Sequence, residues 1–248
     1  MNTIFVHRDG RTEQVTSIDR GWLGAGAAVY LWVDLSAPSI PESLVLTDTF
    51  AFHRLAVEDA MEQSQSPKIE AYDGYLFAAI AGSDADVAFF VGPHYLVSVH
   101  WREAKAIGDL MDSVRHGGKA FADGPVGMFH RLVDAATIGL TPAMDKLAAW
   151  TNALEKRMLE KANVDLVVET LDARRDVLAI AQRLGRQREA LDRLVRNEVV
   201  DISAEMAFRF RHVRDRLIRL SDSAHALDHR LAGLLTAVSA LAAGRRWM

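Results

Sequence analysis

The stretch that decides the fold covers residues 206–241 and reads MAFRFRHVRDRLIRLSDSAHALDHRLAGLLTAVSAL. Its apolar residues recur in alternating steps of four and three, a 3.5-residue period held over five heptads. This heptad series consists of Met206, Phe210, Val213, Leu217, Leu220, Ala224, Leu227, Leu231, Leu234, Val238 and Leu241. The pattern predicts a supercoiled helix over about 202–246, which at about 1.5 Å per residue would be roughly 68 Å long.

Two further helices are expected before this one. From Met128 onward the chain has a single proline, Pro142, and few glycines, while apolar residues keep a helical spacing throughout. We therefore predict helices over about 128–161 and 165–198. Together with the last helix they would form a set of long antiparallel helices that ends in a coiled-coil-like stalk helix.

Residues 1–126 have a mixed pattern. Segments rich in β-branched and aromatic residues predict strands at Thr3–His7, Val29–Leu35, Lys68–Ala81, Ala85–Val91 and Tyr95–Trp101. Helices are predicted at Pro41–Phe50, Arg54–Gln63 and Glu103–His116. The expected fold class is therefore α+β, with an α/β/α N-terminal domain at 1–126 and a long-helix domain at 127–248. The glycine-rich stretch 117–127 marks the boundary.

Charge and composition exclude several classes of protein. Residues 1–126 carry 9 Lys and Arg against 17 Asp and Glu, whereas residues 127–248 carry 20 against 16. The basic start of the last helix (Arg209, Arg211, Arg214, Arg216 and Arg219) is therefore expected to pair with the acidic first half. The chain has no cysteine, which excludes disulfides and thiolate chemistry. We find no catalytic motif and no aromatic residues among the arginines, so we expect neither an enzyme nor a nucleic-acid-binding protein.

Two groups of residues could hold a metal ion. Glu58 and Asp59 are adjacent carboxylates, and oxygen ligands suit a hard divalent cation such as Mg²⁺. In the last helix Asp215, Asp222 and His229 recur every seven residues at an outer heptad position, and His225 lies four residues before His229, a spacing that suits Zn²⁺. The alternative for both groups is a set of solvated polar side chains.

Three blocks follow one another in the first half: FHRLAVED at 52–59, QSPKIEAY at 65–72 and YLF at 75–77. Together and in this order they resemble the CorA family of divalent-cation channels. That family typically reads His-Pro-Leu-Ala-(Leu/Val)-Glu-Asp and then Gln-Arg-Pro-Lys-(Val/Ile)-Glu-x-Tyr. Arg54 and Ser66 depart from the pattern, and the similarity otherwise extends over nearly the whole chain.

The resemblance implies a fold and a mechanism. The family is a homopentamer with a cytoplasmic α/β/α domain, followed by long helices of which the last continues into the membrane and lines the pore. Cytoplasmic Mg²⁺ bound between subunits holds the channel closed. By position, the regulatory ligands fall on Asp59 and Asp215, with Glu58 and Asp134 as helpers. The outer face of the last helix would then meet the acidic domain of the next subunit.

Both membrane helices of that family and the Gly-Met-Asn signature between them are absent from the sequence. We therefore expect a soluble cytoplasmic fragment that belongs at the cytoplasmic side of the inner membrane and cannot itself conduct ions. One alternative is a ZntB-like member handling zinc, cobalt or nickel, which His225 and His229 would support. The other is a soluble coiled-coil adaptor derived from the same family.

Overall fold

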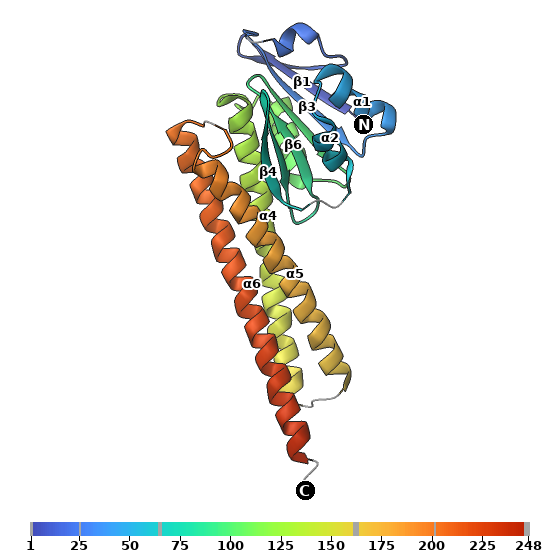
Figure 1. Cartoon of the computed structure of the whole chain (residues 1–248), viewed down its shortest axis with the longest axis vertical. Helices are drawn as coiled ribbons and strands as arrows, with labels where there is room; N and C mark the ends of the chain where they lie inside the picture. Colours follow the sequence, from blue (N-terminus) through green and yellow to red (C-terminus); the bar gives the residue numbers. More distant parts are fainter. Residues whose placement is uncertain (1, 25, 64–65, 161–163, 201, 246–248) are drawn as a thin grey trace. The chain divides into compact units, whose positions relative to one another are not determined.

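The computed structural model describes residues 2–24, 26–63, 66–160, 164–200 and 202–245. Its first half contains one seven-stranded sheet with the strand order β2-β1-β3-β7-β6-β5-β4 (Figure 1). The strands are β1 Asn2–Arg8, β2 Arg11–Val15, β3 Tyr30–Ser36, β4 Lys68–Tyr72, β5 Tyr75–Ile80, β6 Val87–Val91 and β7 Tyr95–His100. Only β3 and β7 pair in parallel; every other neighbouring pair is antiparallel.

The helices follow the predicted pattern with shifted ends. They are α1 Ile40–Leu44, α2 Arg54–Met61, α3 Lys105–Arg115, α4 Gly124–Glu160, α5 Val164–Val195 and α6 Ala204–Arg245, with a 3₁₀ turn at Arg20–Leu23 and a π-helical turn at Val45–Thr49. The predicted helix at Pro41–Phe50 is thus a short α-helix that continues as a π turn. The predicted strand Lys68–Ala81 is two strands, because Asp73 and Gly74 turn the chain; Gly74 has a φ of 78°. The predicted α+β class is confirmed.

Helices cover both faces of the sheet. Successive side chains of a strand point to opposite faces, and here both sets are apolar, so both faces need a cover. On one face Leu31, Val33 and Phe90 belong to a core that includes Ala56 and Ala60 of α2. On the other face lie the alternate residues of the same strands, such as Trp32 and Phe89, which are also buried. There the ring of Phe89 packs against Phe129 of α4, with centroids 5.3 Å apart. The first half is therefore an α/β/α structure.

A buried polar network joins the two parallel strands. Asp34 of β3 accepts a hydrogen bond from the Ser98 hydroxyl (2.5 Å) and lies 3.2 Å from Nε2 of His100, both on β7. The indole N–H of Trp32 donates to Ser98 over 3.1 Å. The other ring nitrogen of His100 is 2.6 Å from the carbonyl oxygen of Arg102, which can only accept. Both ring nitrogens of His100 thus face acceptors, an arrangement that suits the protonated imidazole.

The chain divides into two compact units: unit 1 comprises Met1–Gly139 and Arg186–Arg214, and unit 2 comprises Leu140–Gly185 and Asp215–Met248. The predicted boundary between 126 and 127 follows composition and stays a prediction. In the described part of the chain, none of the helices combines the length and the apolar character that crossing a bilayer takes.

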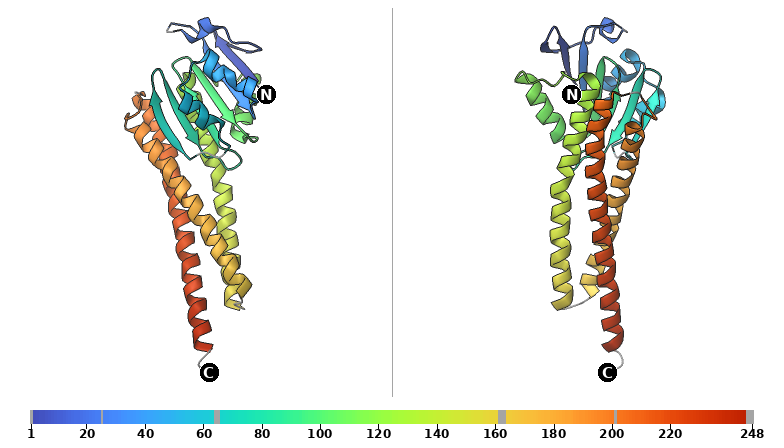
Figure 2. Two further views of the ribbon diagram at one scale, coloured as in Figure 1. Left: turned by 45° about the vertical axis from the view of Figure 1, so that its right-hand side comes forward. Right: turned by 90° about the vertical axis from the view of Figure 1, so that its left-hand side faces the viewer.

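Unit 2 consists of segments of α4, α5 and α6 that run in alternating directions (Figure 2). Ion pairs join each helix to the others: Arg157 with Glu169, Arg174 with Asp228, and Arg230 with Glu155, at 2.8, 2.7 and 2.5 Å. The heptad series is buried from Met206 through Leu234, as the sequence predicts. Val238 is half-buried, and the side chain of Leu241 lies outside the described residues.

The expected pairing of basic residues of α6 with the acidic first half is confirmed within unit 1 for Arg209. Its guanidinium lies 2.7 Å from Asp123 and 2.6 Å from Glu205. The hydrogen bond from Arg209 lowers the pKa of the Asp123 carboxyl, so that this aspartate stays charged. The pair connects the start of α6 to the turn before α4.

The Asp34–His100 pair predicts a pH dependence of stability. Burial lowers the pKa of His100, but the hydrogen bond and charge of Asp34 outweigh it, so the pKa is raised overall. A raised folded-state pKa contributes stability below the unfolded value of about 6.5. We expect this contribution to be lost as the pH rises from about 6.5 through the folded-state pKa of His100. The free energy of unfolding in urea, measured across this pH range, tests the expectation. His100→Gln should remove the dependence, whereas His229→Gln on the exposed face of α6 should keep it.

Candidate metal site

Helix α2 presents Glu58 and Asp59 next to the sheet. Its first turn is capped by His53, whose ring nitrogen accepts the N–H of Leu55 over 3.3 Å. Ala56 and Ala60 are buried, so the helix sits on the sheet along that side. Glu58 lies on the outer side of α2, with 52% of its side chain exposed. Asp59 is at the border of the buried side, with 32% exposed.

Lys68 of β4 lies directly against Asp59. Its ammonium nitrogen is 2.5 Å from Oδ2 of Asp59 and 3.4 Å from Oε1 of Glu70, and it lies 5.5 Å from the centroid of the Phe77 ring. Partial burial lowers the pKa of Lys68, but the hydrogen bond to Asp59 and the charge of Glu70 outweigh it and raise the pKa overall. Lys68 is therefore charged at neutral pH and lies between two carboxylates.

These residues line an open cleft of about 730 Å³ in unit 1, which we call the acidic cleft. Its lining residues are Leu55, Glu58, Asp59, Glu62, Lys68, Glu70, Ala71, Tyr72, Arg193, Glu198 and Val199. Five carboxylates thus face two cationic side chains. Arg193 contributes to the wall: it donates to the carbonyl oxygen of Ile69 over 3.5 Å and lies 4.0 Å from Glu198. The surplus of negative charge makes the cleft attractive to a cation.

The other residues predicted as magnesium ligands do not line this cleft. Asp134 is half-buried on α4 in unit 1, one helical turn after His130. Burial lowers the pKa of His130, and the charge of Asp134 raises it by a smaller amount, so this pKa is lowered overall. Asp215 is half-buried on α6 and belongs to unit 2. Metal binding by these residues stays a prediction, for Asp59, Glu58, Asp134 and Asp215 alike.

The residues proposed for zinc lie on exposed turns of α6. Asp222, His225 and His229 are each exposed, which agrees with the polar outer face expected for those heptad positions. Throughout the described ranges, no three side chains of His, Asp, Glu or Cys are grouped closely enough to hold a metal ion. The zinc hypothesis likewise stays a prediction.

The sequence interpretation assigned no role to Lys68, Glu70 and Glu198. Lys68 and Glu70 could have been identified from the sequence, because residues two positions apart on a predicted strand point to the same face. No local pattern connects Glu198 with Asp59. It lines the cleft because the end of α5 lies beside β4, which is a contact between segments far apart in the sequence (Figure 1).

Comparisons with known proteins agree on one family. The sequence profile described as CorA-like Mg2+ transporter protein matches residues 27–245. The putative metal ion transporter YfjQ of Bacillus subtilis (strain 168) is 27% identical over 199 residues, which cover 78% of this chain and 62% of YfjQ. The chain thus spans less than two thirds of the length of that relative.

Two solved structures share the fold. The soluble domain of CorA from Methanocaldococcus jannaschii matches with a TM-score of 0.77 at 15% identity, covering 94% of this chain and 95% of that chain. The ZntB cytoplasmic domain from Vibrio parahaemolyticus RIMD 2210633 matches with a TM-score of 0.76 at 11% identity, covering 98% of both chains. At these identities the likeness establishes the fold alone.

The acidic cleft predicts how Lys68 affects cation binding. In Lys68→Met the carboxylates of Asp59 and Glu70 lose their shared cation, so the protein should be destabilised by about 1 kcal/mol or less, since the pair is partly exposed. Mg²⁺ should then raise the thermal unfolding midpoint more in the variant than in the parent chain. Lys146→Met, at an exposed position of α4, is the control and should respond to Mg²⁺ as the parent does. An equal response of Lys68→Met and the parent would contradict this account.

Proposed function

Since the chain belongs to the family of CorA-like Mg²⁺ transporter proteins, we propose that it is the ion-sensing part of a divalent-cation channel. In this proposal Mg²⁺ binds between neighbouring copies of the chain. Asp59 of one copy and Asp215 of the next are the ligands, with Glu58 and Asp134 as helpers. Co²⁺ and Ni²⁺ are further candidate ions. The full-length protein is then a homopentamer, with this chain on the cytoplasmic side of the membrane.

The observation that carries the proposal is the charge of the acidic cleft. Five carboxylates line it against Lys68 and Arg193. Carboxylates that face one another repel unless a cation lies between them. The chemistry fits the ion, because Mg²⁺ is a hard cation that prefers oxygen ligands and keeps several of its waters. Few direct protein ligands are therefore needed from each copy.

A ligand from a second copy fits the position of Asp215. It occupies an outer heptad position of α6, two residues before the buried Leu217 and hence away from the centre of the apolar seam. A carboxylate there can meet a neighbouring copy without disturbing the seam. Within each copy, Glu58 is 2.7 Å from Arg54 and Asp59 is 2.5 Å from Lys68. Both cations would share these carboxylates with the incoming ion.

In this mechanism the ion stabilises the arrangement of copies that it bridges. A ligand that binds one state more tightly shifts the equilibrium toward that state. Loss of Mg²⁺ would leave the carboxylates of neighbouring copies opposed across the interface, so their repulsion would favour another arrangement. The channel is thereby closed while cytoplasmic Mg²⁺ is plentiful, and it opens when the ion is depleted.

A second candidate is a domain of a zinc transporter, in which the exposed pair His225 and His229 binds Zn²⁺. The two imidazoles are one helical turn apart, a spacing at which both can bind one ion. Zn²⁺ would then raise the unfolding midpoint of the parent chain but not that of His225→Ala/His229→Ala. Mg²⁺ would have no effect that depends on these histidines.

The experiment for the first proposal is the solution mass measured by light scattering, with and without millimolar Mg²⁺. We expect a shift toward the mass of a pentamer with Mg²⁺, and we expect Asp59→Ala/Asp215→Ala to abolish the shift. The matched control is Asp109→Ala/Asp222→Ala, because Asp109 is exposed on α3 and Asp222 lies one heptad after Asp215. A shift that survives in Asp59→Ala/Asp215→Ala would overturn the assignment of these ligands.

A further inference from the structure

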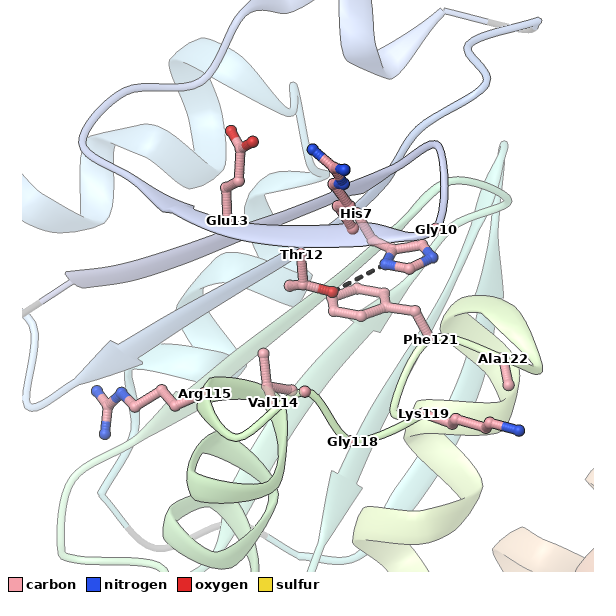
Figure 3. Close-up of a pocket in the computed structure, with 12 residues that line it drawn as sticks. His7, Gly10, Thr12, Glu13, Val114, Arg115, Gly118, Lys119, Phe121 and Ala122 are labelled. Atoms are coloured by element: carbon pink, nitrogen blue, oxygen red, sulfur yellow. Dashed lines mark hydrogen bonds between the residues drawn. The ribbon is translucent and has the colours of Figure 1, made fainter.

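The cleft beside β2 in unit 1 does not bring its charged groups together. Arg115 and Lys119 line its two ends and point away from each other (Figure 3). The ring of Phe121 is already covered by that of His7, with centroids 5.1 Å apart and planes inclined by 5°. A small ligand in this cleft would therefore contact neither both cations nor a free aromatic face.

A groove of about 510 Å³ runs between α4 and α6 in unit 2, and we call it the stalk groove. The two helices run in the same direction (Figure 2). On α6 the lining residues recur in steps of three and four, so that they share one face of the helix: Arg216, Arg219, Ser223, Ala226 and Arg230. On α4 the lining residues Thr141, Asp145 and Ala148 have the same spacing. The groove thus has two walls, one from each helix.

Small side chains keep the middle of the stalk groove open. Ser223 and Ala226 follow one another along the α6 wall, and Ala148 lies on the α4 wall. The Ser223 hydroxyl donates to the backbone carbonyl oxygen four residues earlier, over 2.9 Å, so its polar group is satisfied within the helix. The buried side chains of Leu220 and Leu227 line the groove as well. An apolar side chain can therefore enter without leaving a polar group unpaired.

Arginines give the stalk groove a positive charge. Among its described lining residues, Arg216, Arg219 and Arg230 oppose one carboxylate, Asp145. Arg230 is partly neutralised by Glu155 of α4, which lies 2.5 Å from its guanidinium. The excess of positive charge therefore lies toward the other end of the groove, at Arg216 and Arg219.

The outer face of α5 has complementary properties. Its apolar side chains Val168 and Leu171 are 51% and 47% exposed. Asp165 and Asp172, both exposed, lie three residues before and four residues after Val168 and hence on the same face. Asp172 is 3.2 Å from Arg175, but both side chains are largely open to water, where such a pair is weak. An apolar pair is thus flanked by carboxylates.

Within one copy of the chain, this face of α5 points away from the rest of unit 2. Ala173 and Val177 of α5 are buried, and they lie on the side of the helix opposite Val168. Helix α5 therefore cannot turn Val168 into the stalk groove of its own copy. The apolar and acidic groups that the groove would accept are available to it from another copy.

We propose that the stalk groove of one copy holds the outer face of α5 of a second copy. Val168 and Leu171 then pack against the small side chains, and Asp165 and Asp172 lie near the arginines. Such a contact is head-to-tail, because it joins two different surfaces of one chain, and it forms a ring when the rotation closes. The inference rests on the proposed assembly of copies, but it adds a contact that needs no metal.

Light scattering of the whole chain in a chelator, at low salt and over a range of protein concentrations, tests the proposal. We expect the mean mass to rise with concentration, and the rise to weaken with added salt, which screens the arginines from the carboxylates. A mass that stays at one copy would overturn the inference. If Mg²⁺ alone then raised the mass, the metal-bridged assembly would stand without this contact. Association in the chelator with no effect of Mg²⁺ would support the contact and contradict the metal bridge.

Two variants separate the two surfaces. Ala226→Trp fills the stalk groove, and Val168→Gln/Leu171→Gln removes the apolar pair of α5. Each should weaken association by about tenfold or more, because the packed contact is lost. The matched controls are Ala149→Trp, exposed on α4 outside the groove lining, and Phe208→Gln, which changes a side chain 54% exposed in unit 1. An equal loss in the controls would refute the assignment.

A mixture of the two variants makes the test specific to a head-to-tail contact. The Ala226→Trp copy retains its α5 face, and the Val168→Gln/Leu171→Gln copy retains its groove. One intact contact therefore remains for each mixed pair, and we expect the mass of two copies and nothing larger. A mixture that stays at one copy would show that the two surfaces are not partners. Masses beyond two copies would show that association uses another surface.

Discussion

The parallel pairing of β3 with β7 is the contact on which the first half of the molecule depends. It joins strands that lie more than 60 residues apart and unites the three N-terminal strands with the four that follow. Parallel pairing over such a distance needs favourable side-chain contacts to offset the loss of chain entropy. The hydrogen bonds of Asp34, Ser98 and His100 act across this pair at the centre of the sheet. Helix α2, and with it Asp59, packs on β6 and β7, directly beside this junction.

Local pattern predicts the long helices and most of the strands. The heptad series predicts α6 reliably, because every turn of the helix buries the same face and the apolar spacing therefore recurs many times in the sequence. Strand β2 was not predicted, because Arg11–Val15 has one clearly apolar residue and lies at the edge of the sheet. An edge strand has one paired side and little buried surface, so it places few demands on its sequence.

The candidate site was predictable only in part. Glu58 and Asp59 drew attention as adjacent carboxylates on one helix, which is a local feature. The lysine that meets Asp59 comes from a strand, and Arg193 and Glu198 arrive from the end of a helix more than 120 residues further along. Such a cleft is the product of tertiary packing, and a single sequence contains no periodic signal for it. The division into two units could not be predicted from the sequence either, because each long helix contributes residues to both units.

The sheet of unit 1 ends in two edge strands, β2 and β4, and the acidic cleft lies at the β4 edge. Strand edges expose unpaired backbone groups to which another chain can add, and charged side chains there discourage it. Arg11 and Glu13 are the charged side chains of the β2 edge. At the β4 edge this place is taken by Lys68, Glu70 and the guanidinium of Arg193. The charge of these few side chains therefore protects the two open edges of the sheet from pairing with another chain. Removing charge from either edge is therefore expected to expose the sheet to self-association.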